Sequence, residues 1–533
     1  MLGLEVIVVL GLALLLGKTA ASRLRIAPPI VLLILGLLLG FVPALREAYL
    51  PPEVVLLIFL PVLLYWESLT TSLREIRHNL RPIILMSTIL VVLSAGAVAA
   101  TAHAFGLGWG PAWVLGAAVA PTDATAVGAM ARMLPRRTVT LLRAESLVND
   151  GTALVVYGLA VGITVGEEHL STAHVAWLTL LSYGGGALTG AVVACLGIQL
   201  RKRLADPLLE NTAILTLPFA AYLGAEAIHA SGVLAVVICG LIMSQAGPRV
   251  GQAAGRRQTE AFWSLATFLI NGALFVLVGL EAQSVARNLP GTELVSAALT
   301  VVAVTGVVIT VRFAFLFTSP YLIRLIDRRP QQRERRTGAR PRVVSAFTGF
   351  RGAISLALAL SVPTTLTAGT PFPDRNTIVF VTTGVILITL ILQGAALPGV
   401  VRWARLPTDT ALAEERHLAR TQTSTDALNA LPDLAAQLGT DTDVVDRVRR
   451  EFEQQLNLLH AHAENTDDDN EPDLALRQAE QYTALRLAVI EHKRNTMIEL
   501  RDTHRIDDTV LRQMQAALDI EEVRLHRTEN TDS

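Results

Sequence analysis

The chain has 533 residues and a formal net charge of −1; 52% of its residues are hydrophobic and 17% are charged. Soluble domains carry about 25% charged residues. This composition therefore excludes an ordinary soluble protein, and the long apolar runs indicate a membrane protein with many spans. The two cysteines, Cys195 and Cys239, both lie in apolar runs, which argues against a disulfide framework and a thiolate metal site.

Apolar stretches long enough to cross a membrane recur along the first 405 residues. They are predicted at residues 3–17, 27–45, 53–71, 82–104, 111–132, 140–165, 173–200, 209–227, 231–246, 259–283, 294–322, 343–366 and 376–403. The first stretch could be mistaken for a cleaved signal peptide, but Glu5 stands where a positive charge is expected. We interpret it as the first of thirteen spans.

The distribution of Lys and Arg between the predicted loops indicates their orientation. Alternate loops, starting with the first, hold 24 of these residues, and the remaining loops hold 3. Because positive loops stay in the cytoplasm, we predict a protein of the plasma membrane with its N-terminus outside the cell and its C-terminus in the cytoplasm.

Residues 406–533 differ from the rest because they are polar and charged, with apolar residues at helical spacing. The chain is therefore expected to have two domains, a transmembrane domain over 1–405 and a cytosolic helical tail over 406–533. Within the tail, the run TDDDNEPD at 466–473 has the composition of a linker. The tail is expected to be a packing or dimerisation element or a regulatory one.

Ionisable residues inside membrane spans are costly and usually mark an ion path. The predicted spans contain Glu67, Asp123, Glu145, Asp150, Glu226, Arg312 and Arg351, with His103 near an end.

Two of the predicted spans are interrupted. The fifth carries APTDATAVGAM (120–130), in which Pro121 removes a backbone donor next to Thr122 and Asp123. The twelfth carries GFRGAISLALALSVP (349–363), with Arg351 between two glycines. Such breaks are tolerated where protein or a water-filled cavity covers them. For the fifth span, the alternative is a kinked helix with a capping aspartate.

The sixth span carries ESLVNDGTALVVY (145–157). Ser146, Asn149 and Asp150 are three and four residues apart, so they share one face of a helix. Glu145 points in a different direction from Asp150 because five residues correspond to about 140° around a helix. A polar patch that only joins two spans is the alternative.

The order of the spans has an internal symmetry. Spans one to six and eight to thirteen form two sets of six, with the seventh span as connector. Because the offset between the sets is odd, one set is inverted relative to the other. The two interrupted spans then correspond, and paired interrupted helices in inverted halves point to a transport site near the membrane midplane.

The chain resembles the monovalent cation/proton antiporter-1 family of the sodium/proton exchanger superfamily, which includes bacterial NhaP-like antiporters. The resemblance covers about residues 1–405. Besides the three motifs above, it rests on PPEVVLLIFLPVLLYWESL (51–69), YLGAEAIHASGVLAVVICGL (222–241) and FWSLATFLINGALFVLVGLE (262–281). The implied fold is an all-α homodimer with crossed broken helices.

The resemblance also implies roles for individual residues. Asp150 is expected to carry the ion and the proton, with Asp123, Ser146 and Thr122 as further Na⁺ ligands and Asn149 beside them. Glu145 and Arg351 are expected to form a structural ion pair.

These residues favour a transporter, not an enzyme, that exchanges Na⁺, and by extension Li⁺, for H⁺ by alternating access. Cation and proton would compete for Asp150, and Asn149 in place of a second acid implies electroneutral 1:1 exchange. No cofactor and no nucleic-acid partner are expected; the partners are the two ions, the bilayer and a second subunit. The alternatives are K⁺/H⁺ exchange, a passive channel and an intramembrane aspartyl protease, although the sequence contains no GxGD.

Overall fold

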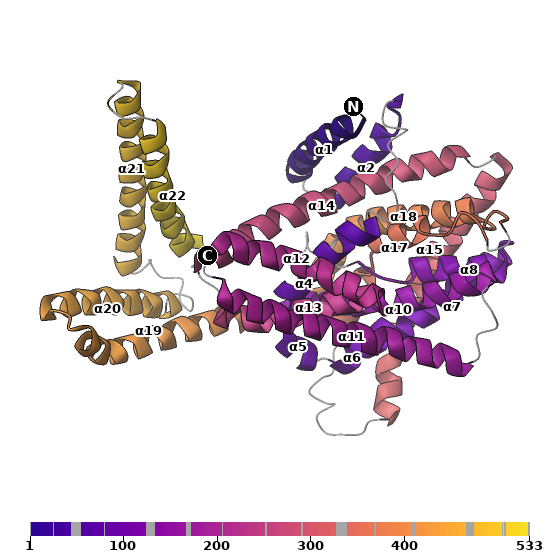
Figure 1. Cartoon of the computed structure of the whole chain (residues 1–533), viewed down its shortest axis with the longest axis horizontal. Coiled ribbons are helices and arrows are strands. Elements are labelled where there is room, and N and C mark those ends of the chain that lie inside the picture. The colour runs from indigo at the N-terminus through magenta and orange to yellow at the C-terminus, as the bar shows by residue number, and fades with distance from the viewer. Residues whose placement is uncertain are drawn as a thin grey trace. The chain divides into compact units, whose positions relative to one another are not determined.

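The computed structural model forms two compact units, residues 1–408 and 409–533. It describes residues 2–24, 26–43, 55–78, 80–123, 134–166, 172–204, 206–250, 253–288, 291–326, 338–366, 369–406, 411–464, 474–503, 505 and 508–530. These residues are mainly helical and contain no β-strand (Figure 1). The prediction of an all-α fold is confirmed.

The first unit is an array of helices, and its longest helices have the length and apolar composition of membrane spans. Its helical elements are α1 (Leu2–Leu24), α2 (Pro28–Leu39), η2 (Val55–Phe59), α4 (Leu60–Thr70), α5 (Leu73–His78), α6 (Leu80–Ile84), η3 (Leu85–Ile89), α7 (Leu90–Ala104), α8 (Trp109–Val119), α10 (Arg136–Val165), α11 (Thr172–Arg203), α12 (Pro207–Glu226), α13 (Gly232–Ala246), η5 (Gly247–Arg249), α14 (Ala253–Asn288), α15 (Gly291–Ile326), α16 (Ala339–Phe347), α17 (Ala353–Leu360) and α18 (Arg375–Ala404).

Each of the predicted apolar segments overlaps at least one of these helices. In the described part of the chain, eight helices are long and apolar enough to cross a membrane, and four shorter apolar helices accompany them. The chain is therefore a membrane protein with several spans. The count of thirteen spans, their inverted symmetry and their orientation stay predictions.

The two predicted interruptions occur where expected. Helix α8 ends at Val119 and is followed by non-helical residues up to 123, and α16 and α17 are separated by residues 348–352. The remainder of the first motif, residues 124–130, lies outside the described residues, as does the predicted linker at 466–473.

Tight packing holds the helices around these breaks. Helices α2 and α14 cross so closely that a Cβ on Gly279 would overlap the backbone of Leu33 and Leu37, as is common where small residues line an interface between membrane helices. Trp263 of α14 is buried and stacks on Trp66, with ring centroids 5.9 Å apart. These contacts hold α14 against both α2 and α4.

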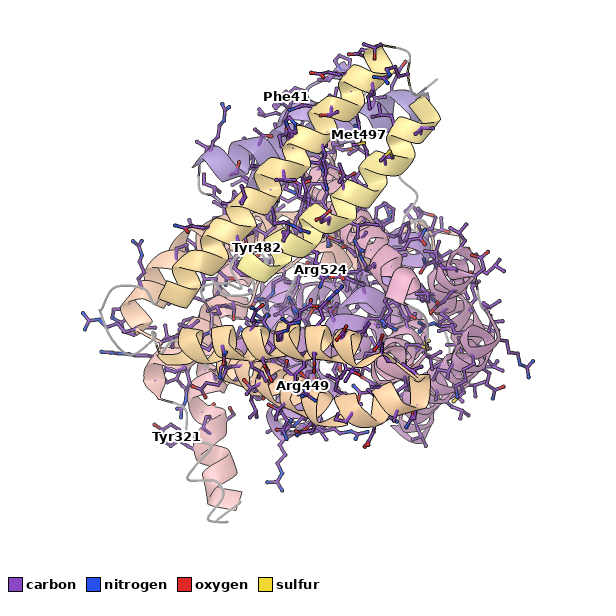
Figure 2. The ribbon with its side chains drawn as sticks, turned by 90° about the vertical axis from the view of Figure 1, so that its left-hand side faces the viewer. Phe41, Tyr321, Arg449, Tyr482, Met497 and Arg524 are labelled. Carbon is purple, nitrogen blue, oxygen red and sulfur yellow. The ribbon has the colours of Figure 1, made fainter. Side chains whose placement is uncertain are left out.

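The second unit contains four helices, α19 (Ala411–Leu438), α20 (Thr442–Glu464), α21 (Leu474–Asp502) and α22 (Asp508–Asn530). Helices α21 and α22 pack as a pair, with Met497 between them and Tyr482 exposed (Figure 2). Arg494 of α21 forms ion pairs with Asp519 and Glu522 of α22. The pair is therefore held by both apolar and charged contacts.

Candidate functional site

The two interrupted segments meet. The Asp123 N–H donates to the Phe350 carbonyl at 2.8 Å, and Arg351 Nε donates to the carbonyl of Val119, the last residue of α8, at 3.1 Å. Arg351 places a positive charge at the C-terminus of α8, and Asp123 places a negative charge near the N-terminus of α17. Each helix end is stabilised by a charge of that sign. The crossing of the two breaks thereby satisfies backbone groups that the breaks leave unpaired.

Gly352, just before α17, allows this crossing. A Cβ at this position would overlap Cβ, Cγ and Oδ2 of Asp123. The Asp123 side chain therefore lies directly against the Gly352 backbone. Any larger residue in place of Gly352 would displace the Asp123 carboxylate.

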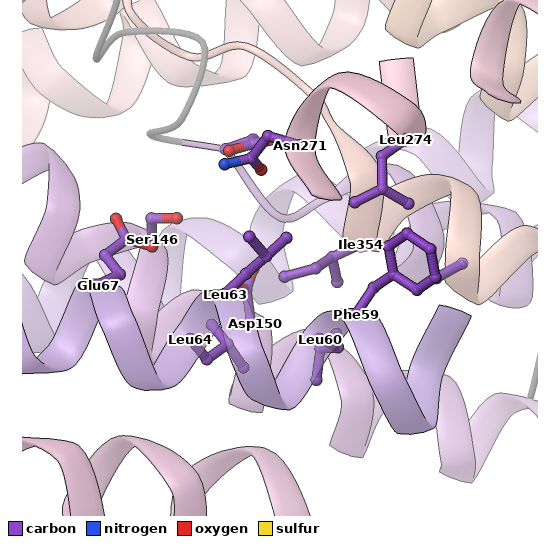
Figure 3. Close-up of a pocket in the computed structure, with 12 residues that line it drawn as sticks. Phe59, Leu60, Leu63, Leu64, Glu67, Ser146, Asp150, Asn271, Leu274 and Ile354 are labelled. Carbon is purple, nitrogen blue, oxygen red and sulfur yellow. The ribbon is translucent and has the colours of Figure 1, made fainter. Parts of the chain in front are cut away.

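A small pocket lies beside this crossing and is open enough for a water-sized particle. Its free volume is about 30 Å³, which exceeds the roughly 10–15 Å³ that one water needs by this measure. It is lined by Phe59, Leu60, Leu63, Leu64, Glu67, Asp123, Ser146, Asp150, Asn271, Leu274, Ile354 and Ala357 (Figure 3). Polar side chains from α4, α10, α14 and the α8 break therefore face a largely apolar chamber.

Asp150 is the most buried carboxylate of this pocket, with 2% of its surface exposed. Among the described residues, its Oδ2 atom has no hydrogen-bond partner. A buried carboxylate oxygen without a partner is costly, and either a proton or a cation would remove that cost. Ser146, one turn earlier on α10, lines the same pocket and offers a hydroxyl oxygen.

Asn149 and Thr122 belong to a different face of the site. The Asn149 amide donates to the Thr122 hydroxyl at 2.7 Å, and that hydroxyl lies 3.4 Å from Glu145 Oε1. Both line a second cavity of about 10 Å³, which is at the lower limit for one water. The structure thus brings Asp150, Asp123 and Ser146 together at the larger pocket and places Thr122 and Asn149 behind it.

The predicted ion pair between Glu145 and Arg351 is wrong. Glu145 is paired with Arg312 of α15, whose Nη1 and Nη2 donate to Oε1 at 2.5 Å and Oε2 at 3.1 Å. Glu145 and Arg312 are each 2% exposed, so this is a buried, bidentate pair. Arg351 does not reach Glu145 because its guanidinium binds the Val119 and Gly349 carbonyls that the two breaks expose.

Sequence reasoning missed two pocket residues. Glu67 stood out as an acid inside a predicted span and lies in the 51–69 motif, but neither helical spacing nor the resemblance linked it to Asp150; the structure places it beside Ser146 (Figure 3). Asn271 is uncharged and lies in an apolar run, so a search for ionisable residues passes over it.

The three carboxylates line the pocket without converging on one point. In the part of the chain that the structure describes, no group of three His, Cys, Asp or Glu side chains is arranged to hold a metal ion. A cation here would therefore take its oxygens from a mixture of carboxylates, hydroxyls, amides and water.

The opposite end of α17 is also capped by charge. Arg375, the first residue of α18, donates from Nε to the Val362 carbonyl at 2.9 Å and from Nη2 to the Leu360 carbonyl at 3.2 Å. A cation at a helix C-terminus is stabilising. The half-helix that supplies Ile354 and Ala357 to the pocket is thus held at one end by Arg375, with Asp123 at the other.

The chain matches a known protein family and several related sequences. Residues 10–403 match the family described as "Sodium/hydrogen exchanger, transmembrane". An "uncharacterized Na⁺/H⁺ exchanger" of Mycobacterium bovis is 45% identical over 98% of this chain and 96% of its own length. The Na⁺/H⁺ antiporter ApNhaP of Aphanothece halophytica is 31% identical over 64% of this chain and 63% of its own.

Two further matches are a second bacterial antiporter and a solved structure. A "sodium, potassium, lithium and rubidium/H⁺ antiporter" of Bacillus pumilus is 30% identical over 64% of this chain and 52% of its own. The structure of the sodium/proton antiporter MjNhaP1 from Methanocaldococcus jannaschii superposes with a TM-score of 0.57 at 21% identity, covering 75% of this chain and 99% of that one. The prediction of an antiporter fold with broken helices is confirmed.

Proposed function

Because the chain belongs to the sodium/hydrogen exchanger family, we propose that it exchanges Na⁺ for H⁺ across the plasma membrane, with Asp150 carrying each ion in turn. The family consists of cation/proton exchangers, which are transporters and not enzymes. The observation that carries the proposal is the buried Asp150 carboxylate, whose Oδ2 atom has no partner among the described residues and which lines a water-sized pocket beside the crossed breaks.

Exchange follows from the cost of the empty site. An anionic Asp150 buried at this depth is unfavourable, whereas Asp150 with either a proton or Na⁺ is neutral. Only the two loaded forms would then cross between the faces of the membrane in alternating access, so that one ion moves in as the other moves out. Electroneutral 1:1 exchange requires one titrating group per cycle, which Asn149 next to Asp150 favours.

The oxygens that would hold Na⁺ come from Asp150, Asp123 and Ser146, completed by water, and Glu67, which lines the same pocket, is proposed to attract the cation by its charge. Hard oxygen ligands suit hard cations. Thr122 is proposed to support the site from behind, through the hydroxyl that accepts from Asn149, and its place in the predicted set of Na⁺ ligands stays untested.

Potassium/proton exchange is the second candidate. It is favoured by the similarity to the Bacillus pumilus protein, whose name includes K⁺ and Rb⁺ beside Na⁺ and Li⁺. The same oxygens could hold either ion, since the difference between them is one of cavity size.

The test is a proton-flux assay on the full chain in liposomes, with Na⁺, Li⁺ or K⁺ added outside and the membrane potential clamped at several values. We expect Na⁺ and Li⁺ to drive proton movement at a rate that does not change with the clamped potential. Proton movement driven by K⁺ alone would favour the second candidate. A rate that rises steeply with potential would contradict 1:1 exchange, and no counter-transport with any of the three ions would contradict the proposal itself.

The proposal extends to assembly, which the family resemblance supports, and to orientation, which the distribution of Lys and Arg between the predicted loops supports. The chain is proposed to work as a homodimer, with its N-terminus outside and its 406–533 tail in the cytoplasm, and to need no cofactor. Cross-linking of the chain in native membranes and protease accessibility of the tail in sealed vesicles test these points separately.

A further inference from the structure

A basic hollow lies at the end of α18, away from the candidate ion pocket. It has a volume of about 640 Å³, and its described lining consists of Arg340, Gly399, Arg402, Trp403 and Arg405. Three of these five residues are arginines and none is acidic. The hollow is therefore a concentration of positive charge between the start of α16 and the end of α18.

These arginines are not neutralised by carboxylates among the described residues. Arg340 lies over the Trp403 ring, with Cζ 5.9 Å from its centroid, and Arg402 Nε donates to the Pro398 carbonyl at 3.3 Å. Unpaired guanidinium groups attract anions, and their planar fork suits the oxygens of a phosphate group. The three arginines of the hollow therefore suit an anionic ligand with the geometry of a phosphate group.

The position of the hollow, at the end of a membrane-spanning helix, points to a lipid. Helix α18 is long and apolar enough to cross a membrane and ends at Ala404. Trp403, with 56% of its surface exposed, is one residue from that end, where tryptophan marks the boundary between acyl chains and headgroups. A basic pocket between spans at this level is a typical headgroup site.

The surface of α18 next to the hollow suits an acyl chain. Leu392, Gly399 and Trp403 are seven and four residues apart, so they lie along one face of the helix. Leu392 is 55% exposed, and the 11 residues from it to Trp403 span about 16 Å. An apolar track therefore leads away from the arginines along the exposed face of α18.

We propose that this hollow binds the headgroup phosphate of an anionic phospholipid, whose acyl chain lies along α18. The apolar track favours a lipid over a free phosphate ion, because a free anion would use the arginines and leave the track unoccupied. Nothing in the proposal depends on which cation the protein exchanges.

The experiment is a binding measurement on the purified, delipidated full chain in detergent. Native mass spectrometry would follow binding of phosphatidylglycerol and of phosphatidylcholine, with inorganic phosphate as a soluble competitor. The test variant is Arg402→Gln/Arg405→Gln. The control is Lys202→Gln/Arg203→Gln, which removes two exposed positive charges from the end of α11. Arg340→Gln, on a different helix, provides an independent variant should the double variant be unstable.

Wild-type protein is expected to bind phosphatidylglycerol more tightly than phosphatidylcholine. The double variant should weaken phosphatidylglycerol binding roughly 25-fold, at about fivefold per arginine, and Arg340→Gln about fivefold, with phosphatidylcholine binding and the control unchanged. Equal losses in the test and control variants would show a general charge effect, and retention of phosphatidylglycerol by the Arg402/Arg405 variant would remove the site. Displacement of the lipid by millimolar inorganic phosphate would make the ligand a free anion. Each of these results overturns the proposal.

Discussion

The pairing of Glu145 with Arg312 can be tested by a double-mutant cycle. The structure gives Glu145 two hydrogen bonds from Arg312, at 2.5 and 3.1 Å, in a fully buried setting. Removing one partner of such a pair leaves an uncompensated charge and costs about 3–5 kcal/mol. Glu145→Gln and Arg312→Gln should therefore each destabilise the protein by about that amount.

The double variant Glu145→Gln/Arg312→Gln leaves no unpaired charge at the pair and should cost clearly less than the sum of the single variants. A coupling energy of at least about 1.5 kcal/mol is expected for a close buried pair. Arg351→Gln should also destabilise, because it leaves the Val119 carbonyl unsatisfied at about 1–3 kcal/mol. No hydrogen bond joins Arg351 to Glu145 among the described residues, so the Glu145/Arg351 cycle should couple more weakly than the Glu145/Arg312 cycle.

The assay is reversible unfolding of the full chain in mixed micelles, followed by tryptophan fluorescence, for the single and double variants. A larger coupling of Glu145 with Arg351 than with Arg312 would refute the pairing and restore the assignment made from sequence. Equal coupling to both arginines would show that the three charges act as one network, which the separate partners in the structure do not predict.

Three other predictions follow from the crossing and the pocket. Gly352→Ala should reduce exchange at least about tenfold by displacing the Asp123 carboxylate, while Gly158→Ala, where a Cβ meets nothing within 4 Å, should leave the exchange rate of proteoliposomes near wild type. Arg375→Gln should destabilise the protein by about 1–2 kcal/mol through loss of the α17 cap, and Arg375→Lys should restore about half, as measured by unfolding; an unchanged stability in Arg375→Gln would contradict the capping role. Glu67→Gln should raise the apparent KM for Na⁺ about tenfold with a smaller change in maximal rate, and an unaltered KM would remove Glu67 from the proposed site.

Much of the fold was predictable because a bilayer imposes a length and a composition on each span. The interrupted segments were predictable for a related reason, since Pro121 and the glycines around Arg351 cannot continue a regular helix. The structure then shows what the sequence could not, namely that the two breaks bind each other through Asp123 and Arg351.

The error at Glu145 has a physical cause. Two neighbouring predicted spans each contribute a buried arginine, and a sequence does not say which of the two faces a given carboxylate. The carbonyls freed by the breaks compete with Glu145 for guanidinium groups, and in the structure they bind Arg351 while Arg312 remains for Glu145. A sequence reading that counted these freed carbonyls as partners could have favoured Arg312.

The set of pocket residues was only partly predictable. Asp150 and Ser146 follow from helical spacing, because four residues place them on one side of α10. Glu67 and Asn271 come from helices far apart in the chain, and only the packing of α4 and α14 brings them to the same chamber. Asn149 is next to Asp150 in sequence, yet its amide faces Thr122 instead of the larger pocket.

The central claim is that one carboxylate, Asp150, carries both the cation and the proton. Its most direct test compares wild type, Asp150→Asn and Asp206→Asn in proteoliposomes, measuring Na⁺ uptake and proton efflux together over a range of pH. Asp206 caps α12 through its side chain, a role that Asn also fills. The claim predicts that wild type and Asp206→Asn exchange the two ions with an apparent KM for Na⁺ that falls as pH rises, while Asp150→Asn reconstitutes but moves neither ion above background. Coupled Na⁺ uptake and proton efflux by Asp150→Asn would contradict it.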